Sequence, residues 1–188
     1  MTDSASPVNS QWAAIIADVA QSPNKDILIE TTDPQFDEQV CRATFAEPDP
    51  SDIRDGRGLQ VRLSATIAET ITSVDGVQKT AGWVWRGRPT HVEAASNEER
   101  ARQQAEIGCR SLAGALVAAK LLRKGEQPTL TQLVTLLPQL EGKEVVLRFF
   151  LKAGKTRDDN GDLKQFQEVR FAPAGTANAA DAPATSDY

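Results

Sequence analysis

Apolar and polar residues alternate most regularly in the middle of the chain, between residues 59 and 71. From residue 59 to residue 67 every second position is apolar and the residues between are polar; the apolar set is Leu59, Val61, Leu63, Ala65 and Ile67. A period of two predicts a strand with one face buried and the other in solvent. Asp75-Gly76 then predicts a tight turn, so residues 77–87 are expected to return as the hairpin partner.

Similar patterns predict further strands on both sides of this hairpin. They cover residues 26–32, 38–47, 144–153 and 164–171. Two polar segments are expected to be long connections between strands. Residues 47–58 are rich in proline, glycine and acids, and residues 154–163 are mostly charged or small.

Apolar residues at helical spacing predict a short helix over residues 11–21. They fall at i, i+3, i+4 and i+7: Trp12, Ile15, Ile16 and Val19. The pattern leaves two interpretations open. The helix either docks on the body of the protein or is offered to a partner.

Two more helices are expected between the strand pairs. The first begins at Ser96, because Glu99 stands three residues later at the capping-box spacing, and it ends at Gly125. The second is capped by Thr129 and stopped by Pro138.

In chain order the elements are strand, long loop, strand, tight turn, strand, helices, strand, polar hairpin, strand. A five-stranded OB (oligonucleotide-binding) barrel has this order, with its helix between strands 3 and 4. We therefore predict an α+β, mainly β fold, with an OB-like domain at residues 26–173. A lead and short helix occupy 1–25, and a disordered acidic tail occupies 174–188. Any other α+β domain with hairpins could give the same order.

Charge is unevenly distributed along the chain. Residues 1–56 carry 3 basic and 11 acidic side chains, residues 57–171 carry 18 and 13, and residues 172–188 carry two acids and no base. A basic middle between acidic ends can bind a polyanion in the middle. An unevenly charged, solvated surface is the alternative interpretation.

The sequence gives little support to catalysis, metals or membranes. The chain has two cysteines, Cys41 and Cys109, which are far apart in the sequence. This spacing does not suit a zinc site, and we expect both cysteines to be reduced, in the cytoplasm. The single histidine, His91, lies in a predicted loop, and Gly154-Lys155-Thr156 lacks the upstream spacing of a phosphate loop. No stretch has the length of a membrane span or the pattern of a secretory signal. We expect a cytoplasmic protein that is not an enzyme and has no cofactor.

Four segments resemble a known family. They are GLQVRLSATI (58–67), GWVWRG (82–87), TLTQLVTLLPQLEGKEVVLRFF (129–150) and QEVRFAP (167–173). Over residues 26–173 the chain resembles phage-encoded OB-like single-stranded DNA-binding proteins, a poorly characterised family. The resemblance implies single-stranded DNA binding in phage replication or recombination, in the host cytoplasm. The acidic N-terminal quarter with its extra helix departs from that pattern.

Single-strand binders combine cations that follow the phosphates with aromatic rings on which bases stack. The candidate phosphate contacts are Arg62, Arg86, Arg88, Arg148, Lys152, Lys155, Arg157 and Lys164. The candidate stacking rings are Phe150 and Trp85. In an OB barrel the oligonucleotide would lie across strands 2 and 3, gripped by the connections at 47–58 and 154–163.

Each candidate also has a structural interpretation. Phe150 could pack under a helix, and Arg148 could pair with Glu168 across the sheet. Trp83 and Trp85 share a face, and we favour the interior for it over an outer groove.

The tail ends in Thr-Ser-Asp-Tyr and resembles the acidic tails with which single-strand binders dock replication or recombination proteins. A featureless solubilising tail is the alternative.

The rival function is a protein–protein interaction module, either a virion component or a phage protein that binds a host factor. It would use the acidic N-terminal quarter and the Trp12 helix. Oligomeric state is left open.

Overall fold

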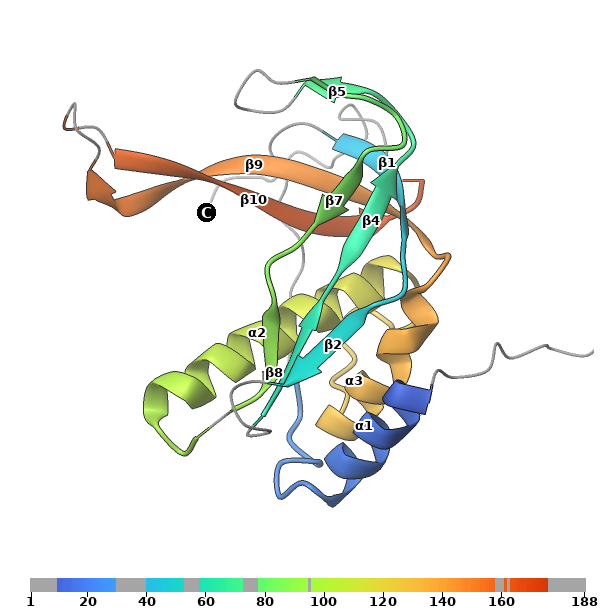
Figure 1. Cartoon of the computed structure of the whole chain (residues 1–188), viewed down its shortest axis with the longest axis vertical. Helices are drawn as coiled ribbons and strands as arrows, with labels where there is room; N and C mark the ends of the chain where they lie inside the picture. Colours follow the sequence, from blue (N-terminus) through green and yellow to red (C-terminus); the bar gives the residue numbers. More distant parts are fainter. Residues whose placement is uncertain are drawn as a thin grey trace, which may run out of the picture.

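The computed structural model describes residues 10–29, 40–52, 58–72, 78–94, 96–157, 161 and 163–175. Some expected features lie outside these residues: the N-terminal lead, the end of the 26–32 strand, the Asp75-Gly76 turn and the tail beyond residue 175. The described chain has mixed α and β structure, as predicted. A curled antiparallel sheet lies above the helices in the view of Figure 1.

The main sheet has five antiparallel strands in the order β10-β9-β1-β4-β7. They are β1 (Val40–Phe45), β4 (Ser64–Ile67), β7 (Val84–Arg86), β9 (Glu144–Arg157) and β10 (Leu163–Pro173). The sheet curls so far that side chains of its two edge strands meet, Trp85 of β7 against Phe171 of β10. Among the described residues no ladder joins β7 to β10. The structure is therefore a half-barrel, and the closed barrel stays a prediction.

The inner face of this sheet supplies much of the core. Every second residue of β1 is buried: Cys41, Ala43 and Phe45 are only 1–2% exposed. Their cross-strand neighbours on the same face are buried too: Ala65, Ile67, Val145 and Leu147. The alternation that predicted these strands is thus the pleat that sorts side chains between core and solvent.

The single strand predicted at residues 59–71 is wrong in one respect, because it is divided among three sheets. Its first part, β3 (Leu59–Arg62), belongs to a second sheet of order β2-β3-β8. Its middle part is β4, and its end, β5 (Ile71–Thr72), pairs with β6 (Gln78–Lys79). The change of sheet occurs at Leu63, which stays buried and so keeps the alternating pattern unbroken.

Two strands of the second sheet were not expected. β2 (Asp49–Asp52) lies inside the predicted 47–58 loop, where its sequence Asp-Pro-Ser-Asp has little strand propensity. β8 (Thr90–Glu93) carries the histidine that we expected in a loop. Both pair with β3, which lies between them.

Strands β9 and β10 continue beyond the main sheet as a two-stranded ribbon. Within the described residues, the last pair between β9 and β1 is Arg148 opposite Val40, whereas pairing with β10 continues to Arg157 opposite Leu163. We call residues 150–157 and 163–168 the arm; it projects to the left in Figure 1. Residues 154–157 and 163 of the predicted 154–163 loop are therefore strand.

Helix α1 (Ser10–Gln21) confirms the predicted N-terminal helix and is docked on the body. It packs against α3. Trp12 is 0% exposed, and its Nε1–H donates to the carbonyl oxygen of Pro48 at 3.3 Å. This helix does not offer Trp12 to a partner.

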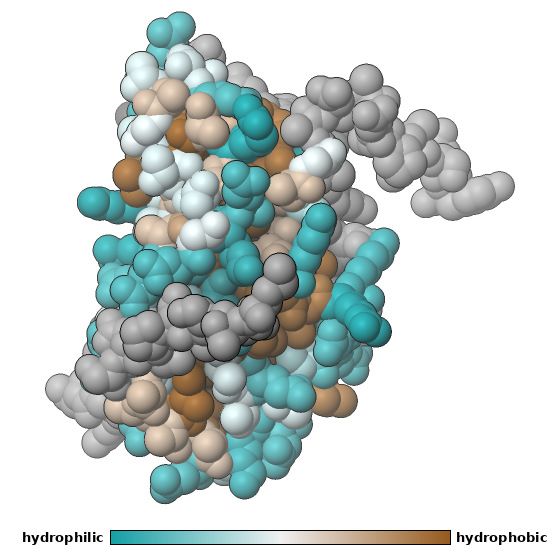
Figure 2. All heavy atoms as spheres, turned by 90° about the vertical axis from the view of Figure 1, so that its right-hand side faces the viewer, coloured by the Kyte–Doolittle hydropathy of each residue, from teal (hydrophilic) through white to brown (hydrophobic). Residues whose placement is uncertain are grey.

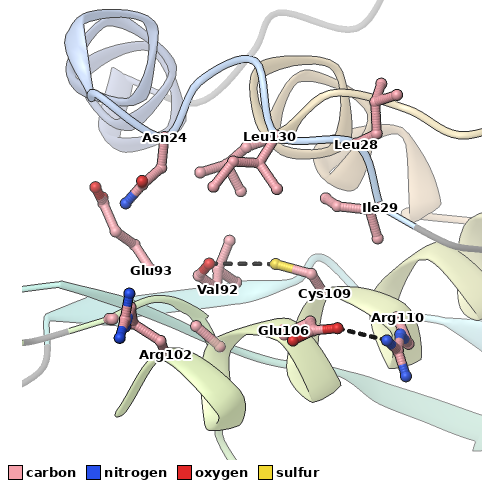
Figure 3. Close-up of a pocket in the computed structure, with 13 residues that line it drawn as sticks. Asn24, Leu28, Ile29, Val92, Glu93, Arg102, Glu106, Cys109, Arg110 and Leu130 are labelled. Carbon is pink, nitrogen blue, oxygen red and sulfur yellow. Dashed lines mark hydrogen bonds and ion pairs between the residues drawn. The ribbon is translucent and has the colours of Figure 1, made fainter. Parts of the chain in front are cut away.

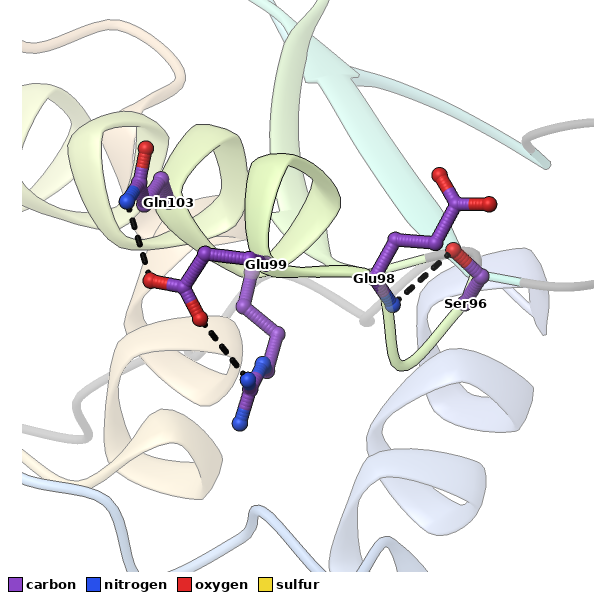
Figure 4. A network of polar contacts seen from close by, with 5 residues as sticks. Ser96, Glu98, Glu99 and Gln103 are labelled. Atoms are coloured by element: carbon purple, nitrogen blue, oxygen red, sulfur yellow. Dashed lines mark hydrogen bonds and ion pairs between the residues drawn. The ribbon is translucent and has the colours of Figure 1, made fainter.

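Helix α2 (Glu99–Ala118) begins later than predicted and ends before Gly125. Its N-cap residue is Glu98, whose backbone N–H donates to Ser96 Oγ at 3.4 Å (Figure 4). The Glu99 carboxylate accepts hydrogen bonds from Arg102 and Gln103, at 2.8 and 2.9 Å. The predicted capping box at Ser96 is wrong, because Glu99 contacts the next helical turn instead.

Helix α3 (Leu130–Leu136) begins as predicted. Thr129 and Gln132 form a capping box: Thr129 Oγ1 accepts from the Gln132 N–H at 3.2 Å, and Gln132 Oε1 accepts from the Thr129 N–H at 2.8 Å. A 3₁₀ turn, η1 (Leu137–Leu140), follows with Pro138 near its start.

The strand predicted at 26–32 is wrong where the structure describes it. Residues 26–29 contribute only an isolated bridge between Leu28 and Thr129. No helix in the described part of the chain has the length and apolar character to cross a membrane. Seen from the right-hand side of Figure 1, the surface is largely hydrophilic with apolar patches between, some beside residues drawn in grey (Figure 2).

Candidate nucleic-acid interface

Three of the predicted arginines lie close together where the two larger sheets join. The Gly87 N–H donates to the Leu63 carbonyl oxygen at 2.9 Å, and one position further on Ser64 pairs with Arg86. Arg62 and Arg88 flank this contact on the two adjoining segments. Arg62, Arg86 and Arg88, which we call the arginine cluster, are all exposed. Asp49 is the cross-strand partner of Arg62 on β2.

The outer face of the main sheet adds exposed positions beside this cluster. The register places Thr44 of β1, Thr66 of β4 and Val84 of β7 side by side on this face. All three are exposed, Val84 at 40%. Arg86 therefore stands at one end of an open surface that crosses three strands.

Arg42 lies on the same face, and sequence reasoning did not select it. Its Nε donates to Glu69 Oε1 at 2.5 Å, with the two side chains 64% and 43% exposed. This hydrogen bond, together with the Coulomb attraction of the carboxylate, raises the pKa of the Arg42 guanidinium. The Arg42 guanidinium is thus already paired with Glu69, which competes with any phosphate for it.

Arg148 differs from the arginine cluster because it is buried. It is 6% exposed, and burial lowers the pKa of its guanidinium. Its direct cross-strand neighbours are Val40 and Arg170, while Glu168 lies opposite Phe150. A nucleic acid on the open face would not reach Arg148 without rearrangement.

The remaining cationic candidates lie on the arm. Lys152, Lys155 and Arg157 are in β9, and Lys164 is in β10. The guanidinium of Arg157 donates to the carbonyl oxygen of Gly161 beyond the end of its strand. The side chains of Phe150 and of the three lysines lie outside the described residues, so their predicted roles stay predictions.

Trp85 lies on the inner side of the curl, as we favoured. Its ring meets Phe171 edge-on, with centroids 5.6 Å apart, and Phe171 in turn contacts Phe45 at 5.2 Å. The ring is half-buried and packs against the core. Trp83 packs against the core too, but Lys79 Nζ lies over its ring, 5.4 Å from the centroid.

A cavity of about 310 Å³ lies away from these cations, between the 24–29 segment, the end of β8 and the first half of α2 (Figure 3). Its apolar lining includes Val92 and Leu130, and the adjacent Ile27 and Leu28 are 54% and 60% exposed. Sequence patterns did not predict this cavity, because its walls come from four separate parts of the chain: residues 24–29, 92–94 and 102–110, and Leu130.

The thiol at the cavity wall is not a reactive group. Cys109 Sγ donates to the Val92 carbonyl oxygen at 3.2 Å. Burial, reinforced by Glu106 and Glu93, raises the pKa of Cys109 to about 12. The thiol is therefore neutral at physiological pH, and a neutral thiol is a poor nucleophile.

Among the described residues, no group of three or more histidine, cysteine or acidic side chains is placed to hold a metal ion. Comparison with known proteins assigns no relative: no family model matches the chain, and no curated protein matches its sequence. Any assignment of function must therefore come from the geometry above.

Proposed function

We propose that this protein binds single-stranded DNA with little sequence preference and acts in phage replication or recombination, in the host cytoplasm. The observation that carries the proposal is the arginine cluster, three exposed cations around the Leu63–Gly87 hydrogen bond. The cluster borders an open sheet face and is accompanied by an arm with four further cationic positions. Closely spaced cations beside a polar face suit a phosphate backbone.

The strand order supports the OB interpretation. When β1, β4, β7, β9 and β10 are numbered one to five, the main sheet reads 5-4-1-2-3. An OB barrel has these same neighbours and closes by bringing its third and fifth strands together. Here the contact between Trp85 and Phe171 spans that seam. In OB proteins the oligonucleotide lies across strands 2 and 3, beside the loop between strands 4 and 5; the counterparts here are the β4–β7 face and the arm.

A titration with a labelled deoxythymidine oligomer tests the proposal. Fluorescence anisotropy with an oligomer of about 20 nucleotides should show that the logarithm of the binding constant falls linearly with the logarithm of the salt concentration. The slope should steepen by about 0.7 for each phosphate contact. Duplex DNA and a uridine oligomer of equal length serve as competitors. Absence of binding at low micromolar protein and low salt would contradict the proposal.

A matched pair of triple variants separates the arginine cluster from net charge. Replacing Arg62, Arg86 and Arg88 by alanine should weaken binding at least about tenfold and flatten the salt slope by about 2. The control removes the same charge from Arg100, Arg102 and Arg123, which are exposed on and after α2. If the two triple variants weaken binding of the oligomer by the same factor, the arginine cluster is not the binding surface.

A second candidate function, a protein–protein interaction module, draws on the cavity. Exposed Ile27 and Leu28 at its wall suit an apolar side chain of a partner protein. Trp12 cannot serve this function in the way we expected, because it is buried. Replacing Ile27 and Leu28 by serine should leave DNA affinity unchanged; a loss of DNA affinity would place nucleic acid at the cavity and contradict the site proposed above.

A further inference from the structure

Trp83 and Lys79 form an aromatic–cation pair at the end of the main sheet. Lys79, in the short strand β6, holds its Nζ 5.4 Å from the centroid of the Trp83 ring. Both side chains are half-buried: Trp83 packs against the core on the same face as Trp85, and part of each side chain stays in contact with solvent. The backbone of Trp83 is fixed on both sides: its N–H donates to the Thr80 carbonyl oxygen at 2.9 Å, and its carbonyl accepts from the Ile67 N–H at 3.0 Å.

The pair lies at the end of the sheet from which the arm departs. Ile67, bonded to Trp83, is opposite Ala43 in the register, and β1 then continues to Val40, opposite Arg148. Beyond Arg148, the pairs of β9 within the described residues are with β10 alone. A strand of nucleic acid that followed the arm towards the sheet would therefore arrive at the end that carries Trp83.

Trp85 is less suited to stack on a base. Phe171 already occupies the space at its ring, and a Cβ built on Gly87 would lie 2.9 Å from Trp85 Cη2. The ring thus fills a seam of the fold. By contrast, the Trp83 ring has the Lys79 cation over its face, and a lysine with four rotatable methylenes can move aside when a ligand arrives.

We propose that Trp83 and Lys79 form a nucleotide subsite at the end of the main sheet that faces the arm, an inference that rests on the proposed function. A base of the single strand stacks on the indole, and Lys79 moves from the ring to the neighbouring phosphate. The cation–π contact in the free protein keeps the ring covered until DNA arrives. Stacking of one base contributes on the order of a 10- to 100-fold gain in affinity.

The alternative is that the pair only stabilises the hairpin of β5 and β6. A purely structural role predicts that changes at Trp83 or Lys79 lower the melting temperature and leave the affinity of the folded protein unchanged. The two roles are therefore separable by measuring stability and affinity on the same variants.

Intrinsic tryptophan fluorescence provides the first test. The chain has three tryptophans, of which Trp12 is fully buried. Saturating wild-type protein with the deoxythymidine oligomer should quench emission; Trp85→Phe should keep this quenching and Trp83→Phe should lose it. Quenching that survives in Trp83→Phe and disappears in Trp85→Phe would overturn the assignment.

Affinity measurements complete the test. Trp83→Leu should weaken binding by about tenfold or more, Trp83→Phe by less because a smaller ring remains, and Lys79→Gln should reduce the salt slope by about 0.7, one phosphate contact. Wild-type affinity in folded Trp83→Leu would refute the subsite while leaving DNA binding intact. If the wild-type protein itself fails to bind the oligomer, the proposed function fails and the subsite fails with it.

Discussion

The ring of Trp85 meets the ring of Phe171 edge-on, with centroids 5.6 Å apart and planes inclined at 74°. The two residues come from the opposite edge strands of the main sheet. Their contact brings those edges together without backbone hydrogen bonds in the described part of the chain. Side-chain packing therefore holds the curl at this seam, and the shape of the open face depends on it.

We expect the seam to contribute measurably to stability. Phe171→Leu should lower the free energy of unfolding by about 1.5 kcal/mol, because a buried ring is replaced by a smaller side chain. A double-mutant cycle with Trp85→Leu should give a coupling of about 0.5–1.5 kcal/mol for an edge-to-face pair. Urea denaturation followed by circular dichroism measures both. Strictly additive losses would show that the two rings do not stabilise each other.

The contact between α2 and β8 predicts a sharp difference between two glycines of the same helix. A Cβ built on Gly108 would lie 1.9 Å from the carbonyl oxygen of His91, whereas one on Gly114 meets nothing within 4 Å. Gly108→Ala should therefore cost about 3 kcal/mol or more, since backbone must move. Gly114→Ala should stabilise the helix by about 0.5–1 kcal/mol. Similar unfolding midpoints for the two variants would contradict the packing of α2 on β8.

Much of the sheet could be predicted because burial on one face imposes a period of two. The alternation in β1 and β9 is the pleat itself, and the capping box at Thr129 is local chemistry that needs no tertiary contact. The change of sheet at Leu63 was missed because it leaves the alternation intact. β2 was missed because its strand state depends on pairing with β3, which outweighs the poor propensity of its residues.

The candidate site was harder to predict for the same physical reason. Arg62 and Arg88 lie side by side because the Gly87 N–H donates to the Leu63 carbonyl oxygen. These two residues are far apart in the sequence. The burial of Arg148 likewise comes from its tertiary surroundings, because alternation alone put it on the outward face of β9. Residue type identified cations, and only the fold distinguished exposed ones from buried ones.

The two cysteines give a pH prediction whose sign follows from burial. Desolvation raises the pKa of both Cys41 and Cys109 to about 12, above the unfolded value near 9. The unfolded state therefore loses thiol protons first as pH rises, so stability from this source is constant below about pH 8.5 and falls between about pH 9 and 12. Urea midpoints across this range measure the fall, and alanine at both positions should flatten it.

A reagent assay checks the same burial at a single pH. Both thiols should resist an aromatic disulfide reagent at pH 8 in the native protein and react fully in denaturant, because a buried, neutral thiol is a poor nucleophile. Rapid reaction of the native protein with two equivalents would contradict the burial of Cys41 and Cys109.

The ion pair between Arg42 and Glu69 predicts a variant that binds DNA more tightly. Glu69→Gln removes the carboxylate that occupies Arg42 on the open face of β1, so the guanidinium becomes available to a phosphate. We expect affinity for the deoxythymidine oligomer to rise about two- to fivefold at low salt and the gain to shrink as salt screens it. Stability should change by less than about 0.5 kcal/mol, because exposed ion pairs contribute little. The matched control is Glu99→Gln, which removes the same charge from an exposed pair with Arg102 on α2. An equal gain in both variants would mean that net charge alone is responsible and that Arg42 lies outside the path of the DNA.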